Sequence, residues 1–181
     1  MKLWLVRHAT PLIATGTCYG ASDIPADAIA TEAQARSLAA ALPQGLPVIC
    51  STLGRCGQLA RALLALRPDL SMTTDARITE MDFGGWEGRH WDDIPQSEYA
   101  AWIHDFAGYT VGGGESVRGF MARVEAALAD SRVHPEAVWI THGGVIRAVS
   151  LLVQGTREVH KAGQWPREAP GHGTWREIMF E

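Results

Sequence analysis

The amino-acid sequence predicts a single domain over residues 1–181, an α/β fold with three layers (α/β/α) and a mainly parallel sheet. Short apolar runs alternate along the chain with longer Ala- and Leu-rich stretches, as expected when helices connect parallel strands. Several of the apolar runs are uninterrupted, which is typical of strands covered on both faces. With 181 residues, of which 46% are hydrophobic and 20% charged, the chain is long enough to build one well-packed core.

Five segments are predicted as strands. Those that begin at residues 3, 47 and 137 are short and apolar, so we expect them to be buried parallel strands. The segment that begins at residue 71 alternates between apolar and polar side chains, the pattern of a half-covered strand. The last segment is expected to form an edge strand. The five are residues 3–6, 47–51, 71–78, 137–141 and 173–180.

Five helices are predicted between these strands. Pro43 and Pro68 follow the first two, and proline commonly stands just beyond the end of a helix. Ser116 follows three glycines and is a candidate N-cap for the fourth helix. The Gly- and Pro-containing residues 10–27 and residues 83–88 are expected to be loops. The predicted helices span residues 31–42, 54–66, 92–106, 115–128 and 143–152.

Composition excludes several classes of protein. With 16 Lys and Arg against 20 Asp and Glu, the net charge is −4, so we expect no nucleic-acid partner. No stretch approaches 18 consecutive apolar residues, so we expect no membrane partner. Three cysteines without a C-x-x-C pair indicate neither a disulfide framework nor a zinc site, and they favour a cytoplasmic location. The edge strand would permit pairing of two copies, so a homodimer is the candidate assembly.

Chemically active side chains follow the predicted strands. In an open parallel sheet, ligands bind beyond the carboxyl ends of the strands, so residues just past these ends are expected to meet there. Any one of them alone would more often be structural, but several together are hard to explain by chance. They are Arg7 and His8 after the first strand, Arg55 after the second, Glu80 after the third and His142 after the fourth.

This set of residue types suits phosphoryl transfer. Guanidinium groups bind phosphate oxygens in pairs, and a neutral imidazole can attack phosphorus to form a covalent intermediate. Gly143 opens a predicted helix, where free main-chain N–H groups can add to an anion site. A carboxyl group such as Glu80 can protonate the leaving oxygen. The expected partner is therefore a small phosphorylated substrate.

Four ordered motifs make the chain resemble the histidine phosphatase (phosphoglycerate mutase-like) superfamily. The first contains the R-H-A of Arg7 and His8, and the second resembles an S-x-L-x-R segment. The third resembles E-x-x-F-G-x-W-E-G, and the fourth resembles S-H-G-G-V-I-R. These motifs stand at residues 5–10, 51–55, 80–88 and 141–147.

The resemblance implies a role for each motif residue. His8 would be the nucleophile that becomes phosphohistidine, and Glu80 would be the proton donor. Arg7, Arg55 and His142 would form the phosphate pocket. No metal or other cofactor is implied.

Within this superfamily, the chain is most similar to the α-ribazole phosphatases of cobalamin biosynthesis. Residues 16–20, 99–102 and 114–116 carry this similarity, and Tyr19 and Gly20 fall at a turn that would face the substrate. Phosphoglycerate mutases have Asn at the position of Ala14 and a longer insertion after the Glu motif. We therefore expect hydrolysis, with α-ribazole 5′-phosphate as the leading substrate. The alternatives are a broad-specificity phosphatase, a mutase-like enzyme and a non-catalytic phosphate-binding protein.

Several other side chains leave two interpretations open. Trp86 either lines the pocket and stacks on a planar substrate or anchors a loop beneath it. Cys50 and Arg55 suggest the C-x5-R of cysteine phosphatases, but only four residues separate them, and an inert core thiol is the better interpretation. Arg118 and Arg123 are interpreted as solvated or ion-paired residues of a helix. The histidines outside the motifs are interpreted as surface residues; they are His90, His104, His134, His160 and His172.

Overall fold

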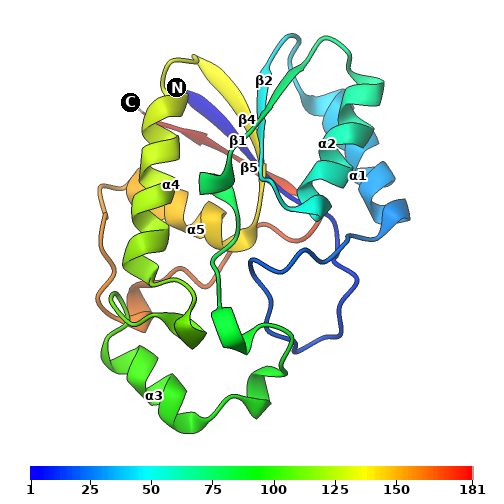
Figure 1. The fold of residues 1–181 in the computed structure, drawn as a ribbon. Helices are drawn as coiled ribbons and strands as arrows, with labels where there is room; N and C mark the ends of the chain where they lie inside the picture. The colour runs from blue at the N-terminus through cyan, green and yellow to red at the C-terminus, as the bar shows by residue number, and fades with distance from the viewer. Residues whose placement is uncertain (181) are drawn as a thin grey trace.

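The computed structural model describes residues 1–180 and is built on a five-stranded sheet in the order β3-β2-β4-β1-β5 (Figure 1). Neighbouring strands from β3 to β1 are parallel, whereas β5 pairs antiparallel with β1 and forms an edge. The predicted mainly parallel sheet and its C-terminal edge strand are therefore confirmed. The strands are β1 (Lys2–Arg7), β2 (Pro47–Cys50), β3 (Ser71–Thr74), β4 (Glu136–Thr141) and β5 (Trp175–Met179).

Helices cover both faces of the sheet, so the structure has the three predicted layers (Figure 1). Leu3 and Leu5 of β1 belong to one core cluster, which includes residues of α4 and α5. Trp4 and Val6 belong to the other, with residues of α1 and α2. This alternation follows from the period of two in a strand. The helices are α1 (Ala28–Ala41), α2 (Gly54–Leu66), α3 (Gln96–His104), α4 (Val117–Ser131) and α5 (Gly143–Leu152).

The register of the two central strands positions the site. β1 and β4 pair so that Arg7 stands opposite Thr141. The pairing continues one residue further, where the N–H of His8 donates to the Thr141 carbonyl at 3.2 Å. His8 and His142 therefore leave the sheet side by side, although they are far apart in the sequence.

The start of the first helix and the end of the third strand differ from prediction. α1 begins at Ala28 rather than at residue 31, because the Asp27 carboxylate accepts from the Ala30 N–H at 2.7 Å and caps the helix earlier. The strand predicted over residues 71–78 ends at Thr74. There the Asp75 carboxylate accepts from the Arg77 N–H at 2.8 Å and opens a 3₁₀ turn. All of β3 is exposed, so the expected covered face is absent in these residues.

Two further helices also differ in length. The helix predicted over residues 92–106 is divided, because Pro95 stands at the N-cap of α3 and a separate 3₁₀ turn forms at Trp91–Asp93. α4 begins at Val117 rather than at residue 115, because the predicted N-cap Ser116 accepts from the Gly119 N–H at 3.1 Å through its hydroxyl, and it continues to Ser131 rather than ending at residue 128. Residues 83–110, which include α3, lie beyond the carboxyl ends of the parallel strands (Figure 1). Among residues 1–180, no helix is both long and apolar enough to cross a bilayer.

Candidate active site

His8 follows β1 and is almost completely buried, with 2% of its surface exposed. Its Nδ1 lies 2.7 Å from the Ala9 carbonyl, which can only accept, so Nδ1 carries the proton and Nε2 presents a lone pair. Burial and the neighbouring Arg55 guanidinium lower the pKa of His8 to about 3. The ring is therefore neutral at pH 7, the form in which an imidazole is a nucleophile.

Arg55 stands in the first turn of α2 and is fully buried. Its Nε donates to Nε2 of His8 at 3.2 Å. Its Nη1 and Nη2 donate to the carbonyls of Ser22 and Gly20 at 2.8 and 2.7 Å, so the loop before α1 holds the guanidinium in place. Arg55 thus carries a fixed positive charge against the His8 ring.

His142 follows β4, and its ring centroid lies 5.1 Å from that of His8. Its Nε2 is 2.7 Å from the Ser51 hydroxyl. Among the hydrogen bonds of this hydroxyl in residues 1–180, the Leu53 N–H is a donor to it, so Nε2 is the acceptor available to its own proton. The proton of His142 is then on Nδ1, a buried atom with no hydrogen-bond partner within the described part of the chain. Burial and Arg55 lower the pKa of His142 well below its usual value.

Arg7 presents a second buried donor without a partner. Its Nη1 donates to the Pro170 carbonyl at 3.0 Å, whereas its Nε has no partner in residues 1–180. The guanidinium packs on Gly143, where an added Cβ would stand 3.2 Å from Cζ. Buried donors are nearly always paired in folded proteins, so the open Arg7 Nε–H and His142 Nδ1–H mark a place for an anion.

Glu80 is held at the N-terminus of α5. Its Oε2 accepts from the Gly144 N–H at 2.9 Å, and its Oε1 lies 3.2 Å from the Met81 N. A Cβ at position 144 would collide with Oε1, so glycine is required there for the carboxylate to approach the helix.

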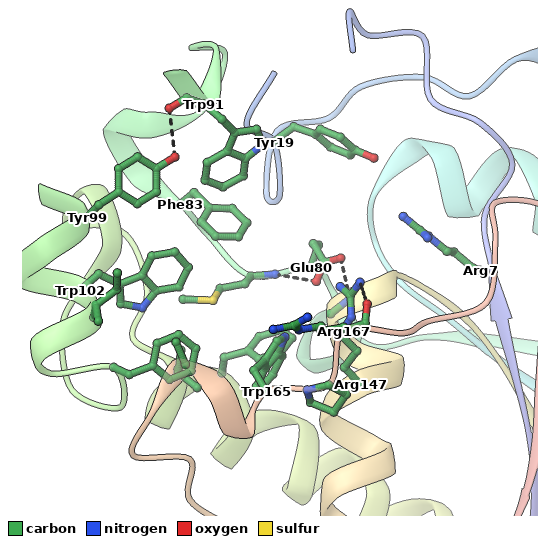
Figure 2. A pocket seen from close by; sticks show the side chains of 18 of the residues that line it. Arg7, Tyr19, Glu80, Phe83, Trp91, Tyr99, Trp102, Arg147, Trp165 and Arg167 are labelled. Carbon is green, nitrogen blue, oxygen red and sulfur yellow. Dashed lines mark hydrogen bonds between the residues drawn. The ribbon is translucent and has the colours of Figure 1, made fainter. Parts of the chain in front are cut away.

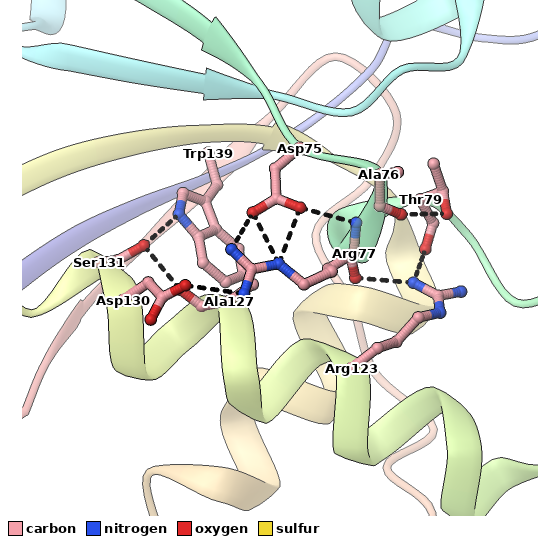
Figure 3. Close-up of polar contacts among 9 residues, drawn as sticks. All are labelled: Asp75, Ala76, Arg77, Thr79, Arg123, Ala127, Asp130, Ser131 and Trp139. Atoms are coloured by element: carbon pink, nitrogen blue, oxygen red, sulfur yellow. Dashed lines mark hydrogen bonds and ion pairs between the residues drawn. The ribbon is translucent and has the colours of Figure 1, made fainter.

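Arg123 of α4 holds the segment that carries Glu80. Its guanidinium donates to the carbonyls of Arg77, Thr79 and Glu80 at 2.7, 2.8 and 3.0 Å. Figure 3 shows the first two of these contacts beside the Asp75–Arg77 pair. Arg123 also pairs with Glu115 at 2.7 Å. The predicted ion pair exists, but the prediction missed that Arg123 also positions the segment that leads to Glu80, because those partners are main-chain atoms.

A cavity of about 750 Å³ opens from this cluster (Figure 2). Arg7, His8, Tyr19 and Glu80 line part of its wall, together with Gly144 and Arg147. The rest of its wall is mostly aromatic and aliphatic. The aromatic members are Phe83, Trp91, Tyr99, Trp102, Phe106, Phe120 and Trp165.

Three residues predicted to bind substrate are not among the cavity-lining residues. Trp86 is 1% exposed and its ring packs against those of Tyr99 and Trp102, at centroid distances of 5.3 and 5.7 Å. It supports the wall, so the loop-anchor interpretation is correct. Gly20 acts through its carbonyl on Arg55, and Gly143 acts by leaving room for Arg7.

His172 was wrongly interpreted as a surface histidine. It is half-buried, and its ring centroid lies 5.4 Å from that of His8. Burial, Arg7 and Arg55 lower its pKa to about 4. No motif contains His172, so its place just before the edge strand beside β1 was the one available signal. His90, His104 and His160 are exposed as predicted, whereas His134 is half-buried.

The Cys50 thiol is buried in β2. Its Sγ lies 3.2 Å from the Ser51 carbonyl, and burial raises its pKa to about 12. A thiol that stays protonated is a poor nucleophile. The structure thus agrees with the interpretation of Cys50 as a core residue.

Comparison with known proteins identifies the family. The model of the histidine phosphatase superfamily (branch 1) matches residues 3–166. The chain is 34% identical over 163 residues to the adenosylcobalamin/alpha-ribazole phosphatase of Escherichia coli K12, covering 84% of this chain and 77% of that protein. It is 35% identical over 165 residues to a protein of Enterobacter sp. strain 638 named probable phosphoglycerate mutase GpmB, covering 86% of this chain and 75% of that protein.

A solved structure agrees over nearly the whole chain. The crystal structure of TTHB049 from Thermus thermophilus superposes with a TM-score of 0.73 at 34% identity, covering 98% of this chain and 93% of that one. Fold, site and comparisons define a phosphatase. The chain belongs to the histidine phosphatase superfamily.

Proposed function

We propose that this phosphatase hydrolyses α-ribazole 5′-phosphate through a phosphohistidine at His8. The neutral, buried imidazole supports His8 as the nucleophile, because its Nε2 lone pair faces the charged groups that would hold a phosphoryl group. The α-ribazole phosphatase of Escherichia coli, at 34% identity, supports the substrate.

In the first step, Nε2 of His8 attacks phosphorus in line with the ester oxygen. The bond between phosphorus and the ester oxygen breaks, and protonated Glu80 gives its proton to the leaving oxygen. The Nε–H of Arg55, which donates to Nε2 of His8 in the free protein, donates to a phosphoryl oxygen instead. The open donors of Arg7 and His142 bind the other oxygens. The Ala9 carbonyl, which accepts from Nδ1, stabilises the positive ring of the phosphohistidine.

In the second step, water attacks the phosphohistidine. The Glu80 carboxylate takes a proton from this water as its oxygen bonds to phosphorus, and the bond between phosphorus and nitrogen breaks. Inorganic phosphate leaves, His8 is neutral again and Glu80 is protonated again. The two steps therefore return every group to its starting state.

The aromatic wall of the cavity is the observation that carries the substrate proposal. Tyr99 and Trp102 of this wall lie on the opposite side of the cavity from Arg7, the neighbour of His8 in the sequence, so a leaving group would extend towards them (Figure 2). Trp102 stacks on Phe106 at a centroid distance of 5.4 Å and an interplanar angle of 14°, so this wall contains flat aromatic surfaces. A substrate with a planar, apolar ring, such as the benzimidazole of α-ribazole, would bury that ring here.

The name of the Enterobacter relative supplies a second candidate, a phosphoglycerate mutase. Phosphoglycerate is small and highly charged and would leave the aromatic surfaces unused. Ala14 also stands where mutases have Asn. We therefore rank hydrolysis of a phosphomonoester whose leaving group carries an aromatic ring above mutase activity.

The deciding experiment measures phosphate release in EDTA by the wild type and by His8→Ala, on α-ribazole 5′-phosphate and on 3-phosphoglycerate. Fast release from the first substrate with an inactive variant supports the proposal. Preference for 3-phosphoglycerate, or its conversion to 2-phosphoglycerate, overturns the substrate. An active His8→Ala variant overturns the nucleophile.

A further inference from the structure

His172 is held close to His8 by main-chain hydrogen bonds of the residues that follow it. The N–H of Gly173 donates to the carbonyl of His8 at 3.1 Å, and the N–H of Arg7 donates to the carbonyl of Thr174 at 3.0 Å. The Arg7 Nη1 bond to the Pro170 carbonyl adds a third connection. The segment on both sides of His172 is thus attached to Arg7 and His8 themselves.

A tight turn fixes the direction of this segment. The N–H and the hydroxyl of Thr174 both bond to the Gly171 carbonyl, at 3.2 and 2.8 Å. Gly173 has φ of +78°, a conformation that residues with a side chain rarely adopt. The turn therefore presents the His172 ring from a defined backbone rather than from a loose tail.

Two imidazoles lie at nearly equal distances from His8. The ring centroid of His142 is 5.1 Å from that of His8, and the ring centroid of His172 is 5.4 Å away. We propose that His172 is a second imidazole donor of the phosphoryl site, beside His142, and that it binds a non-bridging oxygen of the phosphoryl group on His8. This inference rests on the proposed role of His8 as the nucleophile.

The surroundings of His172 suit an anion. The titratable and charged groups near it are Tyr19, Arg7, Arg55 and His8, and the Tyr19 hydroxyl lies 3.5 Å from its Nε2. A neutral imidazole keeps one N–H, which can donate to a phosphoryl oxygen. The oxygens of a dianionic phosphoryl group are charged acceptors, and hydrogen bonds to charged acceptors are shorter and stronger than those between neutral groups.

The position of His172 favours contact with the phosphoryl group over recognition of the leaving group. His172 is not among the residues that line the aromatic cavity, whereas its neighbours His8, Arg7 and Tyr19 are. Its contact should therefore involve the part that every substrate shares, the phosphoryl group. The loss on removing it should then be independent of the leaving group.

The test compares His172→Phe, which keeps a ring but loses the N–H, with His172→Gln, which keeps an N–H donor. His90→Phe is the matched control, because His90 is exposed and outside the cavity lining. The measurements are the Kd of inorganic phosphate by calorimetry and kcat/KM on 4-nitrophenyl phosphate and on glycerol 3-phosphate. Thermal unfolding at pH 8 reports whether each variant folds.

We expect His172→Phe to weaken phosphate binding roughly 10- to 100-fold, the range for a hydrogen bond to a charged group. Its kcat/KM should fall by a similar factor on both esters, His172→Gln should recover most of the loss, and His90→Phe should match the wild type. If the Phe variant does not fold, His172→Leu, which also lacks the N–H, takes its place and should show the same loss.

Different outcomes overturn different claims. If the wild type hydrolyses both esters and His172→Phe binds phosphate equally well, the inference is wrong and the proposed function stands. A loss confined to one ester also overturns it, because it indicates recognition of the leaving group. If the wild type binds phosphate through His172 but releases phosphate neither from these esters nor from α-ribazole 5′-phosphate, the proposed function fails and His172 is a phosphate-binding residue only. A wild type that does neither overturns both.

Discussion

Nε of Arg55 donates to Nε2 of His8 across 3.2 Å, so a buried guanidinium covers the lone pair that would attack phosphorus. Burial, together with this contact, keeps the imidazole neutral, since a proton on Nε2 would be cut off from water and would face the Arg55 charge. Arg55 thereby holds the proposed nucleophile in its neutral form in the free protein, and in the proposed mechanism it donates to the phosphoryl group instead.

The protonation state of His8 provides the first prediction. Because its pKa is lowered to about 3, the ring should stay neutral from pH 8 down to pH 5. NMR of 13C-labelled histidine, with the His8 signal assigned by its loss in His8→Gln, should show no titration in this range. A midpoint near 6.5 would contradict the proposed electrostatics of the site.

The same pKa predicts how stability depends on pH. Below pH 6.5 the unfolded chain binds a proton at residue 8, whereas the folded protein does not until about pH 3. The contribution of the neutral His8 ring to the free energy of unfolding is therefore fully present above pH 6.5, and it declines as the pH falls towards 3. Between pH 6.5 and 5, His8 should account for about 2 kcal/mol of lost unfolding free energy.

Urea unfolding at the two pH values measures this loss. His8→Gln should lose less free energy of unfolding than the wild type over the interval. His90→Gln, at an exposed position, should behave like the wild type. Equal losses in all three proteins would show that His8 is not held neutral by the fold.

Gly144→Ala should impair the proposed proton donor without removing it. The new Cβ collides with the Glu80 carboxylate, which must move from the Gly144 N–H. Because an alkyl ester needs protonation of its leaving oxygen more than 4-nitrophenyl phosphate does, kcat should fall roughly 100-fold on glycerol 3-phosphate and much less on 4-nitrophenyl phosphate. Gly163→Ala is the control, since a Cβ there meets nothing within 4 Å. Equal losses on both esters would argue against Glu80 as the acid.

Arg123→Gln should loosen the segment that carries Glu80. It removes donors to the carbonyls of Arg77, Thr79 and Glu80, so we expect stability to fall by about 1–3 kcal/mol and kcat to fall with it. Chemical denaturation and steady-state kinetics measure the two effects. Arg118→Gln on the same helix removes only an exposed ion pair with Glu158 and should change stability by less than about 1 kcal/mol. Similar results for both variants would contradict the positioning role of Arg123.

Trp102→Ala should distinguish aromatic from small leaving groups. It removes one flat surface of the cavity wall, so KM for α-ribazole 5′-phosphate should rise roughly 10-fold or more while KM for glycerol 3-phosphate stays close to the wild-type value. Trp175→Phe, in the edge strand outside the cavity lining, is the control. An equal rise for both substrates would indicate a collapsed site rather than a lost recognition surface.

The sequence by itself predicted the succession of strands and helices along the chain and the residues that converge near His8. Arg7, His8 and His142 directly follow or end buried strands, and parallel strands carry such residues to one edge of the sheet. Local patterns were sufficient because the period of a strand and the turn that follows it are encoded within a few neighbouring residues. Boundaries failed where a side-chain cap such as that of Asp27 competed with the apolar pattern.

Only the tertiary structure decided what surrounds that cluster. His172 meets His8 because β5 returns antiparallel beside β1, a pairing that joins residues more than 160 positions apart in the sequence. Trp86 and Trp102 belong to the same aromatic cluster, yet Trp86 lies behind the cavity wall and Trp102 forms part of it. Such distinctions depend on which segments pack together across the sheet edge. Close packing between distant segments leaves no periodic signal in the sequence, so burial and contact at these positions are properties of the folded chain.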